Sequence, residues 1–257
     1  MKIAVITGAS SGMGREAAVQ IGNRFGGLDE VWLIARREER LMELEGRLPT
    51  KVRCFAMDIT VPRELDQLGE ALKKESPDVK ILVNAAGFGR IGKVGEVDLE
   101  TEQAMVRLNC EALCAMTHVV LPYMSPNSRI LQFASSAAFL PQPKFAIYAA
   151  TKSFVLSYSR ALGAELRGRK IYVTAVCPGP VDTEFFDIAE TTDQIPLYKR
   201  LVMANPRGVV KKAIKDSCMG RPVSVYGLTM NGFRVLCKMV PHDILLSILR
   251  TLSDFHG

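Results

Sequence analysis

Short apolar runs alternate along the chain with longer amphipathic stretches. Apolar runs rich in β-branched residues predict strands, and stretches whose apolar positions recur every three or four residues predict helices. The predicted strands are Ile3–Thr7, Val31–Ala35, Val52–Met57, Ile81–Asn84, Arg129–Ala134 and Ile171–Cys177, with a weaker one at Val223–Tyr226. The predicted helices lie near 13–24, 37–47, 62–74, 99–124 and 148–167.

Nearly continuous apolar strands separated by helices are typical of a parallel sheet that is buried on both faces. Because crossovers between parallel strands are right-handed, the pattern predicts a doubly wound sheet. The fold class is therefore α/β, a Rossmann-type three-layer α/β/α arrangement with a mostly parallel sheet of about seven strands. Since no linker interrupts the alternation, we expect one domain over 1–257, with a nucleotide-binding half near 1–134 and a catalytic and substrate half near 135–257.

Two parts of the chain fit this alternation less well. The stretch near 179–204 has no clear secondary structure, and a loop of this length inside a compact domain is usually a functional one, often a lid. The tail near 227–252 is a pair of amphipathic segments broken by Pro241, and its role stays open.

Charge and composition exclude several classes of protein. The 33 Lys and Arg against 27 Asp and Glu give a net charge of +6 that is scattered, so nucleic-acid binding is not favoured. Six cysteines form no CxxC pair, and three histidines form no cluster, so we expect reduced thiols and no metal site. The first residues are a predicted strand rather than a secretory segment, and no apolar run approaches the ~18 residues of a membrane span. These features predict a cytoplasmic protein without stable membrane association.

A glycine-rich turn follows the first strand directly and opens the first helix. Its sequence from Thr7 to Gly14 is TGASSGMG. Glycines there permit a tight turn and a close backbone approach to a pyrophosphate, whose charge is stabilised at the helix N-terminus. The alternative is a Gly/Ser-rich turn without a ligand, but a strand before it and a helix after it favour a nucleotide site.

The end of the second strand predicts which dinucleotide binds. An NAD site usually carries an acid there for the ribose 2′-hydroxyl, whereas this strand ends at Arg36 and Arg37. An arginine can bind a 2′-phosphate, and Arg15 at the start of the first helix could reach the same group. The alternative is that both arginines only begin a charged helix. The sequence favours NADP(H) over NAD(H).

Two further turns at the ends of strands complete the nucleotide prediction. Asp58, with Ile59 beside it, is a candidate clamp for the adenine amino group, or else an N-cap or turn aspartate. The small residues after the fourth strand would let the nicotinamide ribose pass closely over the sheet edge. They belong to the run Asn84, Ala85, Ala86 and Gly87.

Tyr148 and Lys152 lie one turn apart on one face of a predicted helix. A tyrosine with a pKa near ~10 is a poor acid or base at neutral pH, and a neighbouring ammonium would lower that pKa. A Tyr–Lys pair alone is unspecific, but two other residues accompany it. Ser135 leaves the fifth strand, where it can hydrogen-bond a substrate oxygen, and Asn109 is an unusual amide within a long helix. The sixth strand ends in the turn 177–183, CPGPVDT, at the sheet edge where ligands of such folds collect.

In the order of these motifs, residues 1–185 resemble the short-chain dehydrogenase/reductase family in its form of about 250 residues. The resemblance implies a catalytic tetrad in which Tyr148 gives or takes the hydroxyl proton and Ser135 orients the carbonyl or alcohol. Lys152 would bind the nicotinamide ribose and lower the pKa of Tyr148, and Asn109 would hold a water that links Lys152 to solvent. Hydride passes directly from nicotinamide to substrate without a metal.

The same resemblance assigns the cofactor site. Met13 is the one departure in the glycine motif, where other aliphatic residues are usual, and it contacts the cofactor through its backbone. The residues expected at the cofactor are Gly8, Ser10, Ser11, Gly12, Met13, Gly14, Arg15, Arg36, Arg37, Asp58, Ile59, Asn84, Ala85, Ala86, Gly87, Tyr148, Lys152, Pro178, Gly179, Val181 and Thr183.

The leading hypothesis is an NADP(H)-dependent oxidoreductase that interconverts a ketone or aldehyde and an alcohol. The alternatives are a catalytically silent, NADP(H)-sensing regulatory protein of the same fold and a structural scaffold. Apolar residues suggest a bulky lipophilic substrate such as a steroid, retinoid or acyl ketone, although they could equally pack the core or a partner subunit. The resemblance implies a homodimer or homotetramer joined through the helices near 99–124 and 148–167. The apolar residues in question are Phe139, Leu140, Phe145, Phe185, Phe186, Ile188, Ile195, Leu197, Tyr198, Leu245, Ile248, Leu249 and Leu252.

Overall fold

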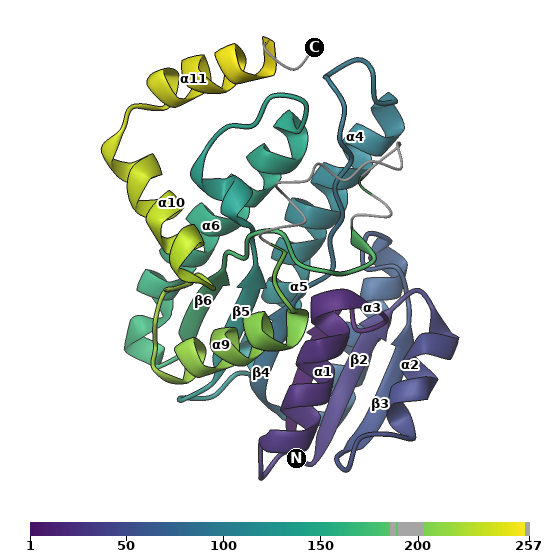
Figure 1. Ribbon diagram of the computed structural model, residues 1–257. Coiled ribbons are helices and arrows are strands. Elements are labelled where there is room, and N and C mark those ends of the chain that lie inside the picture. The colour runs from purple at the N-terminus through teal and green to yellow at the C-terminus, as the bar shows by residue number, and fades with distance from the viewer. Residues whose placement is uncertain (186–188, 190–202, 255–257) are drawn as a thin grey trace.

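The computed structural model describes residues 1–185, 189 and 203–254, without the side chains of 249–254. Its centre is a seven-stranded sheet in the order β3-β2-β1-β4-β5-β6-β7, and every neighbouring pair is parallel (Figure 1). The predicted strands are confirmed to within a few residues. They are β1 Lys2–Thr7, β2 Glu30–Ala35, β3 Lys51–Ala56, β4 Asp78–Asn84, β5 Arg129–Phe133, β6 Tyr172–Val176 and β7 Val223–Ser224.

Helices cover both faces of the sheet, which makes the three-layer fold (Figure 1). Alternate residues of β1 contact the helices of opposite faces, because successive side chains of a strand point to opposite sides of the sheet. Ile3 and Val5 pack against α3 (Pro62–Glu75), α5 (Leu113–Val120) and α6 (Ala146–Glu165). Ala4 and Ile6 pack against α1 (Gly12–Arg24), α2 (Glu38–Glu45) and α9 (Pro206–Cys218). Both faces are therefore buried, as the continuous apolar strands predict.

Helix α9 is a feature that the sequence pattern did not predict. Asn205 caps it by accepting a hydrogen bond from the Arg207 backbone N–H at 2.9 Å, and Pro206 occupies the first helical position. Only a short apolar stripe, Val209, Val210 and Ala213, is buried, so the Lys-rich remainder conceals the periodicity. The tail forms α10 (Leu228–Met239) and α11 (His242–Asp254), two segments separated at Pro241 as predicted.

The long helix predicted near 99–124 is interrupted. It comprises α4 (Leu99–Val106), a π-helix at Arg107–Ala112, α5 and a 3₁₀ turn at Leu121–Tyr123. A π-helical turn inserts an extra residue into the helix and is often found at functional sites. The whole stretch Leu99–Tyr123 is long and apolar enough to meet a membrane-span criterion, contrary to the expectation from single apolar runs. One such helix is weak evidence of a span, because core helices meet the same criterion and this stretch packs on β4 and α6.

Candidate active site

The glycine motif forms a tight turn between β1 and α1. Gly8 has φ +68°, and a Cβ on it would lie 2.8 Å from the backbone nitrogen of Ala86. A Cβ on Gly14 would lie 2.2 Å from the carbonyl oxygen of Gly8. The hydroxyl of Thr7 accepts hydrogen bonds from the backbone N–H groups of Ala85, at 3.1 Å, and Ala86, at 3.2 Å. Both loops are thus packed backbone against backbone at the carboxyl edge of the sheet.

The N-terminus of α1 fits the pyrophosphate of a dinucleotide. Ser11 is the N-cap residue but makes no side-chain cap hydrogen bond, and the first turn contains no acid. The orphan N–H groups of the first turn and the helix dipole therefore remain available to an anion. Arg15 adds a cation at this end, and its buried Nε has no partner among the described residues.

Two arginines gather around Glu184 beside the glycine turn, where the sequence predicts a 2′-phosphate site. Arg37 donates hydrogen bonds to the Ser10 hydroxyl at 3.3 and 3.4 Å and to the Glu184 carboxylate at 3.1 Å. Arg40 lies 3.9 Å from the same carboxylate. Arg36 instead lies 3.8 Å from the Asp58 carboxylate, and 76 % of its side chain is exposed. Of the two predicted arginines, Arg37 is the one that the structure brings to the glycine turn.

Asp58 and Asn84 both make hydrogen bonds to other side chains or backbone groups of the fold. Oδ1 of Asp58 accepts hydrogen bonds from the backbone and hydroxyl of Thr60 at 2.9 and 2.7 Å, so it forms the turn that the alternative interpretation foresaw. The amide of Asn84 donates to Thr117 and Gln132, both at 3.0 Å, inside the fold. Adenine recognition by Asp58 and its neighbour Ile59, which is buried in the core, stays a prediction.

Tyr148 and Ser135 meet at the end of β5. Tyr148 lies in the first turn of α6 and is buried, and its ring stacks on Phe145 with centroids 4.3 Å apart. Ser135 begins the short 3₁₀ helix Ser136–Phe139 as its N-cap. Burial raises the pKa of Tyr148 to about 12, although a hydrogen bond with the Ser135 side chain opposes this shift. The expectation that Lys152 holds this pKa below its usual value is wrong for this structure, because burial is the largest cause of the shift and the contribution that opposes it comes from Ser135.

Lys152 lies one turn further along α6 and is also buried. Its ammonium donates a hydrogen bond to the Phe133 carbonyl at 2.9 Å and lies 5.6 Å from the centre of the Tyr148 ring. Burial lowers the pKa of Lys152 to about 8. Because the cation is poorly solvated there, additional hydroxyl acceptors near Nζ would stabilise it.

Asn109 joins the π-helix to the same centre. Its amide nitrogen donates to the Phe88 carbonyl at 2.9 Å and to the Thr151 hydroxyl at 3.0 Å, and its oxygen accepts from the Phe88 N–H at 3.1 Å. A Cβ on Gly87 would lie 2.8 Å from the Asn109 oxygen and 3.3 Å from the Lys152 ammonium. All four predicted tetrad residues and the NAAG turn therefore meet at one edge of the sheet.

The turn after β6 lies over the glycine motif. The Pro178 carbonyl accepts a hydrogen bond from the Ser136 N–H at 2.7 Å, next to Ser135. A Cβ on Gly12 would lie 3.4 Å from the Thr183 side chain, so Thr183 faces the glycine turn. The glycine turn, the NAAG turn and the turn after β6 thus lie together at the carboxyl edge of the sheet. Among the described residues, no group of His, Cys, Asp and Glu could hold a metal ion.

Comparison with known proteins agrees with this geometry. The model of the family described as short chain dehydrogenase matches residues 2–194. The chain belongs to this family. Sulfoacetaldehyde reductase 2 of Chromohalobacter salexigens is 36 % identical over 205 residues, which cover 75 % of this chain and 77 % of that protein.

Two solved structures of short-chain dehydrogenases are similar over almost the whole fold. The enzyme of Sphingobium yanoikuyae in complex with NADPH superposes with a TM-score of 0.77 at 27 % identity, covering 94 % of this chain and 97 % of that one. The 3-ketoacyl-(acyl-carrier-protein) reductase of Brucella melitensis complexed with NADH gives 0.75 at 27 % identity, covering 88 % and 96 %. Similar folds thus carry either dinucleotide, so the cofactor has to be argued from this chain's own residues.

Three residues of this short-chain dehydrogenase were missed as functional candidates from the sequence. The Thr7 hydroxyl accepts a hydrogen bond from the NAAG turn. The Thr151 hydroxyl accepts a hydrogen bond from the Asn109 amide and donates one to the Tyr148 carbonyl at 2.8 Å. Both threonines could have been found from the sequence, since each lies inside a motif already identified. Glu184 had no signal, because its contact with Arg37 spans 147 residues of chain.

Aromatic side chains surround Tyr148 in the short-chain dehydrogenase site. Phe145 stacks on Tyr148, Phe185 lies 5.4 Å away between ring centroids, and Phe88 packs in the same cluster. Leu140 packs away from this cluster, against Cys237 and Leu245 of the tail. Five candidates for the substrate site lie outside the described residues, and so do the side chains of two tail residues. They are Phe186, Ile188, Ile195, Leu197 and Tyr198, followed by Leu249 and Leu252.

Proposed function

We propose that the protein is an NADP(H)-dependent reductase that converts a ketone or aldehyde into an alcohol, with Tyr148 as the proton donor. The observation that carries this proposal is the buried Tyr148, whose phenol is hydrogen-bonded to the half-buried Ser135 side chain, with the Lys152 ammonium 5.6 Å from the centre of its ring. A catalytically silent sensor of NADP(H) needs the nucleotide turn but has no use for this pair.

The chemistry follows from the protonation states. A dinucleotide bound between Gly12 and Gly87 would supply the hydride. Ser135 donates a hydrogen bond to the substrate carbonyl oxygen and orients it beside Tyr148. With a pKa raised to about 12, Tyr148 is a neutral phenol at pH 7 and gives its proton to the oxygen as an alkoxide develops. Lys152 contributes the ammonium that stabilises the resulting phenolate and, we propose, binds the ribose hydroxyls. The neutral resting phenol supports reduction over oxidation.

The preference for NADP(H) rests on Arg37 and Ser10. Their hydrogen-bonded pair provides a guanidinium and a hydroxyl, which are groups that bind phosphate, and β2 ends without an acid. Glu184 now neutralises that guanidinium. A carboxylate at this point resembles a phosphate in charge and would compete with it, so the 2′-phosphate has to displace Glu184 from Arg37.

The proposed substrate class is a lipophilic carbonyl compound. Phe88, Phe145 and Phe185 make the surroundings of the Tyr148 hydroxyl apolar. An apolar wall favours substrates whose carbon skeleton loses water on binding. The relative that reduces sulfoacetaldehyde shows that the family also accepts small polar aldehydes, so a panel should include both kinds.

The decisive experiment compares Tyr148→Phe with the wild type in NADPH consumption over a panel of steroid, acyl, sugar and simple aromatic carbonyls. We expect the substitution to lower kcat about 10²–10⁴-fold, the usual contribution of a positioned acid. NADPH affinity, measured by fluorescence titration, should stay unchanged because the ring and its stacking remain. Tyr172→Phe, at an exposed tyrosine of β6, is the matched control. Full turnover by Tyr148→Phe would remove Tyr148 from the proposed role.

We also propose that copies of the chain associate through α6. Phe154 is 43 % exposed on this helix and stacks on Tyr158 with ring centroids 6.0 Å apart. An exposed aromatic pair on a long helix favours a protein contact over contact with water. Light scattering of the purified protein measures the assembly directly, and a monomer at micromolar concentration would contradict this proposal.

A further inference from the structure

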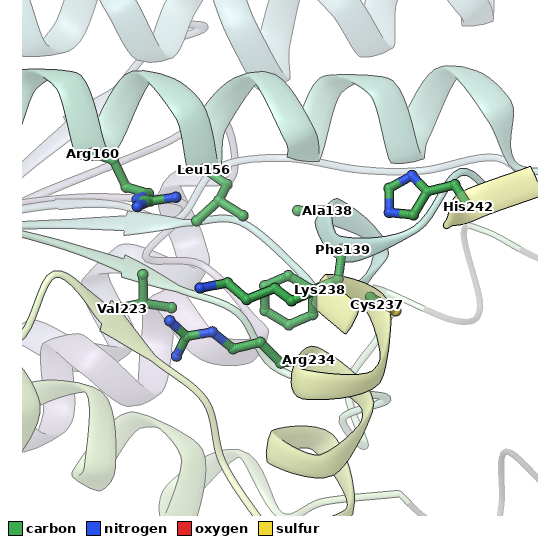
Figure 2. A pocket seen from close by; sticks show the side chains of 9 residues that line it. All are labelled: Ala138, Phe139, Leu156, Arg160, Val223, Arg234, Cys237, Lys238 and His242. Carbon is green, nitrogen blue, oxygen red and sulfur yellow. The ribbon is translucent and has the colours of Figure 1, made fainter. Parts of the chain in front are cut away.

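A cavity of about 210 Å³ lies between α6, the 3₁₀ helix after Ser135, β7 and the start of the tail (Figure 2). Phe139, Leu156 and Val223 give it an apolar floor, and no Asp or Glu lines it. The remaining wall is strongly basic. It consists of Arg160 from α6, Arg234 and Lys238 from α10, and His242 at the start of α11.

The cations of this pocket have no counter-charge in the part of the chain that the structure describes. Arg160, Arg234 and Lys238 enter no ion pair or side-chain hydrogen bond there. Figure 2 shows their nitrogen-bearing ends on the same side of the cavity, close to Val223, with His242 at the opposite end. Like charges gathered without an anion repel each other, and a bound anion would convert this repulsion into several charge-assisted hydrogen bonds.

The size of the cavity limits what can enter it. Because liquid water occupies about 30 Å³ per molecule, the space holds about seven waters, enough for one or two phosphoryl groups with part of their hydration.

The pocket is close to the reacting end. Phe139 is only four residues beyond Ser135, on the 3₁₀ helix that Ser135 caps. Burial raises the pKa of Cys177 at the end of β6 to about 12, and the charges of Arg234 and Lys152 both oppose this shift. An anion held here would thus lie near the substrate without occupying the cofactor site.

We propose that this pocket binds the phosphate group of a small phosphorylated ligand through Arg160, Arg234 and Lys238. Two sources share that chemistry, namely a phosphate carried by the substrate itself and a separate phosphorylated effector. The binding experiment below is independent of the proposed reductase activity, whereas the experiment that separates the two sources rests on it.

Binding is tested with the full-length chain and inorganic pyrophosphate by isothermal titration calorimetry. We expect saturable binding that weakens at least tenfold in Arg234→Gln/Lys238→Gln and also in Arg160→Gln, which changes a different helix. Lys73→Gln/Lys74→Gln removes the same charge from exposed positions of α3 and should leave the affinity unchanged. Arg37→Ala tests whether pyrophosphate binds instead at the proposed nucleotide site. Pyrophosphate binding that is lost only with Arg37→Ala, or no binding at all, would overturn the proposal.

The source is tested by steady-state kinetics with acetoacetyl-coenzyme A, which carries phosphates, and ethyl acetoacetate, which does not. A phosphate on the substrate predicts a KM raised at least tenfold by Arg234→Gln/Lys238→Gln for the coenzyme A ester alone. A separate effector predicts that pyrophosphate changes the rate with ethyl acetoacetate and that this effect disappears in the variant. If the variant instead dissociates an oligomer seen by light scattering, the pocket accepts a second copy of the chain and the phosphate proposal is wrong.

Discussion

Gly14→Ala should damage the nucleotide turn by steric overlap. The new Cβ would lie 2.2 Å from the Gly8 carbonyl oxygen and 2.7 Å from its carbon, which is about 1 Å short of van der Waals contact. Neither group can rotate away, since both belong to the backbone, and Gly8 is itself packed against Ala86. Overpacking of this kind costs about 1–3 kcal/mol, from which alanine's better helix propensity removes up to about 1 kcal/mol.

Because the overlap is with backbone atoms, the cost lies at the upper end of that range, and the net loss of about 2–3 kcal/mol corresponds to a fall in Tm of about 4–12 °C for a domain of this size. Because the turn has to open to admit the methyl group, we also expect NADPH to bind at least tenfold more weakly. Differential scanning fluorimetry with and without NADPH measures both effects.

Gly69→Ala is the matched control for the same chemical change. Gly69 lies inside α3, where a Cβ would find only Val119 at an ordinary 3.9 Å. Helix propensity then dominates, and this variant should be as stable as the wild type or up to about 1 kcal/mol more stable. If Gly14→Ala and Gly69→Ala melt alike and bind NADPH alike, the steric reasoning about the turn is refuted.

Two further predictions concern charges at either end of the site. Arg37→Ala should raise the KM for NADPH far more than the KM for NADH, whereas Arg36→Ala should change both KM values little. Glu184→Gln should tighten NADPH binding about 2–5-fold, the range of a partly exposed ion pair. Equal effects of Arg36→Ala and Arg37→Ala would place the phosphate elsewhere. Lys152 has a folded-state pKa of about 8, lowered by burial, so between pH 8 and 9.5 the unfolded chain keeps a proton that the folded chain has lost. Over that window the wild type should therefore gain about 1.5 kcal/mol of stability to urea relative to Lys152→Met, since the buried thiols with raised pKa give the same opposing slope to both proteins; parallel pH profiles of the two proteins would mean that Lys152 does not titrate there.

Much of this structure could be predicted from local sequence patterns, because its elements depend on local signals. Each apolar run forms a strand whose ends lie within a few residues of the prediction. Ser135, Tyr148 and Lys152 lie together because parallel strands end, and the helices that follow them begin, at one edge of the sheet. The π-helical turn around Asn109 could not be predicted, since its apolar positions fit an ordinary helix equally well. The contact of Glu184 with Arg37 and the burial that raises the pKa of Tyr148 depend on three-dimensional packing, which periodicity does not encode.

Neither edge strand of the sheet is suited to pairing with a strand of a second copy of this chain. At one edge, β7 has only two residues, too few to template a neighbouring strand. At the other, β3 presents Lys51 and Arg53, which are held by Glu30 and Glu75, while the Arg53 guanidinium also lies over Trp32. Charged or very short edges resist the edge-to-edge pairing that leads to aggregation. Neither edge therefore favours a strand-to-strand contact between copies, so the association proposed above depends on the exposed face of α6.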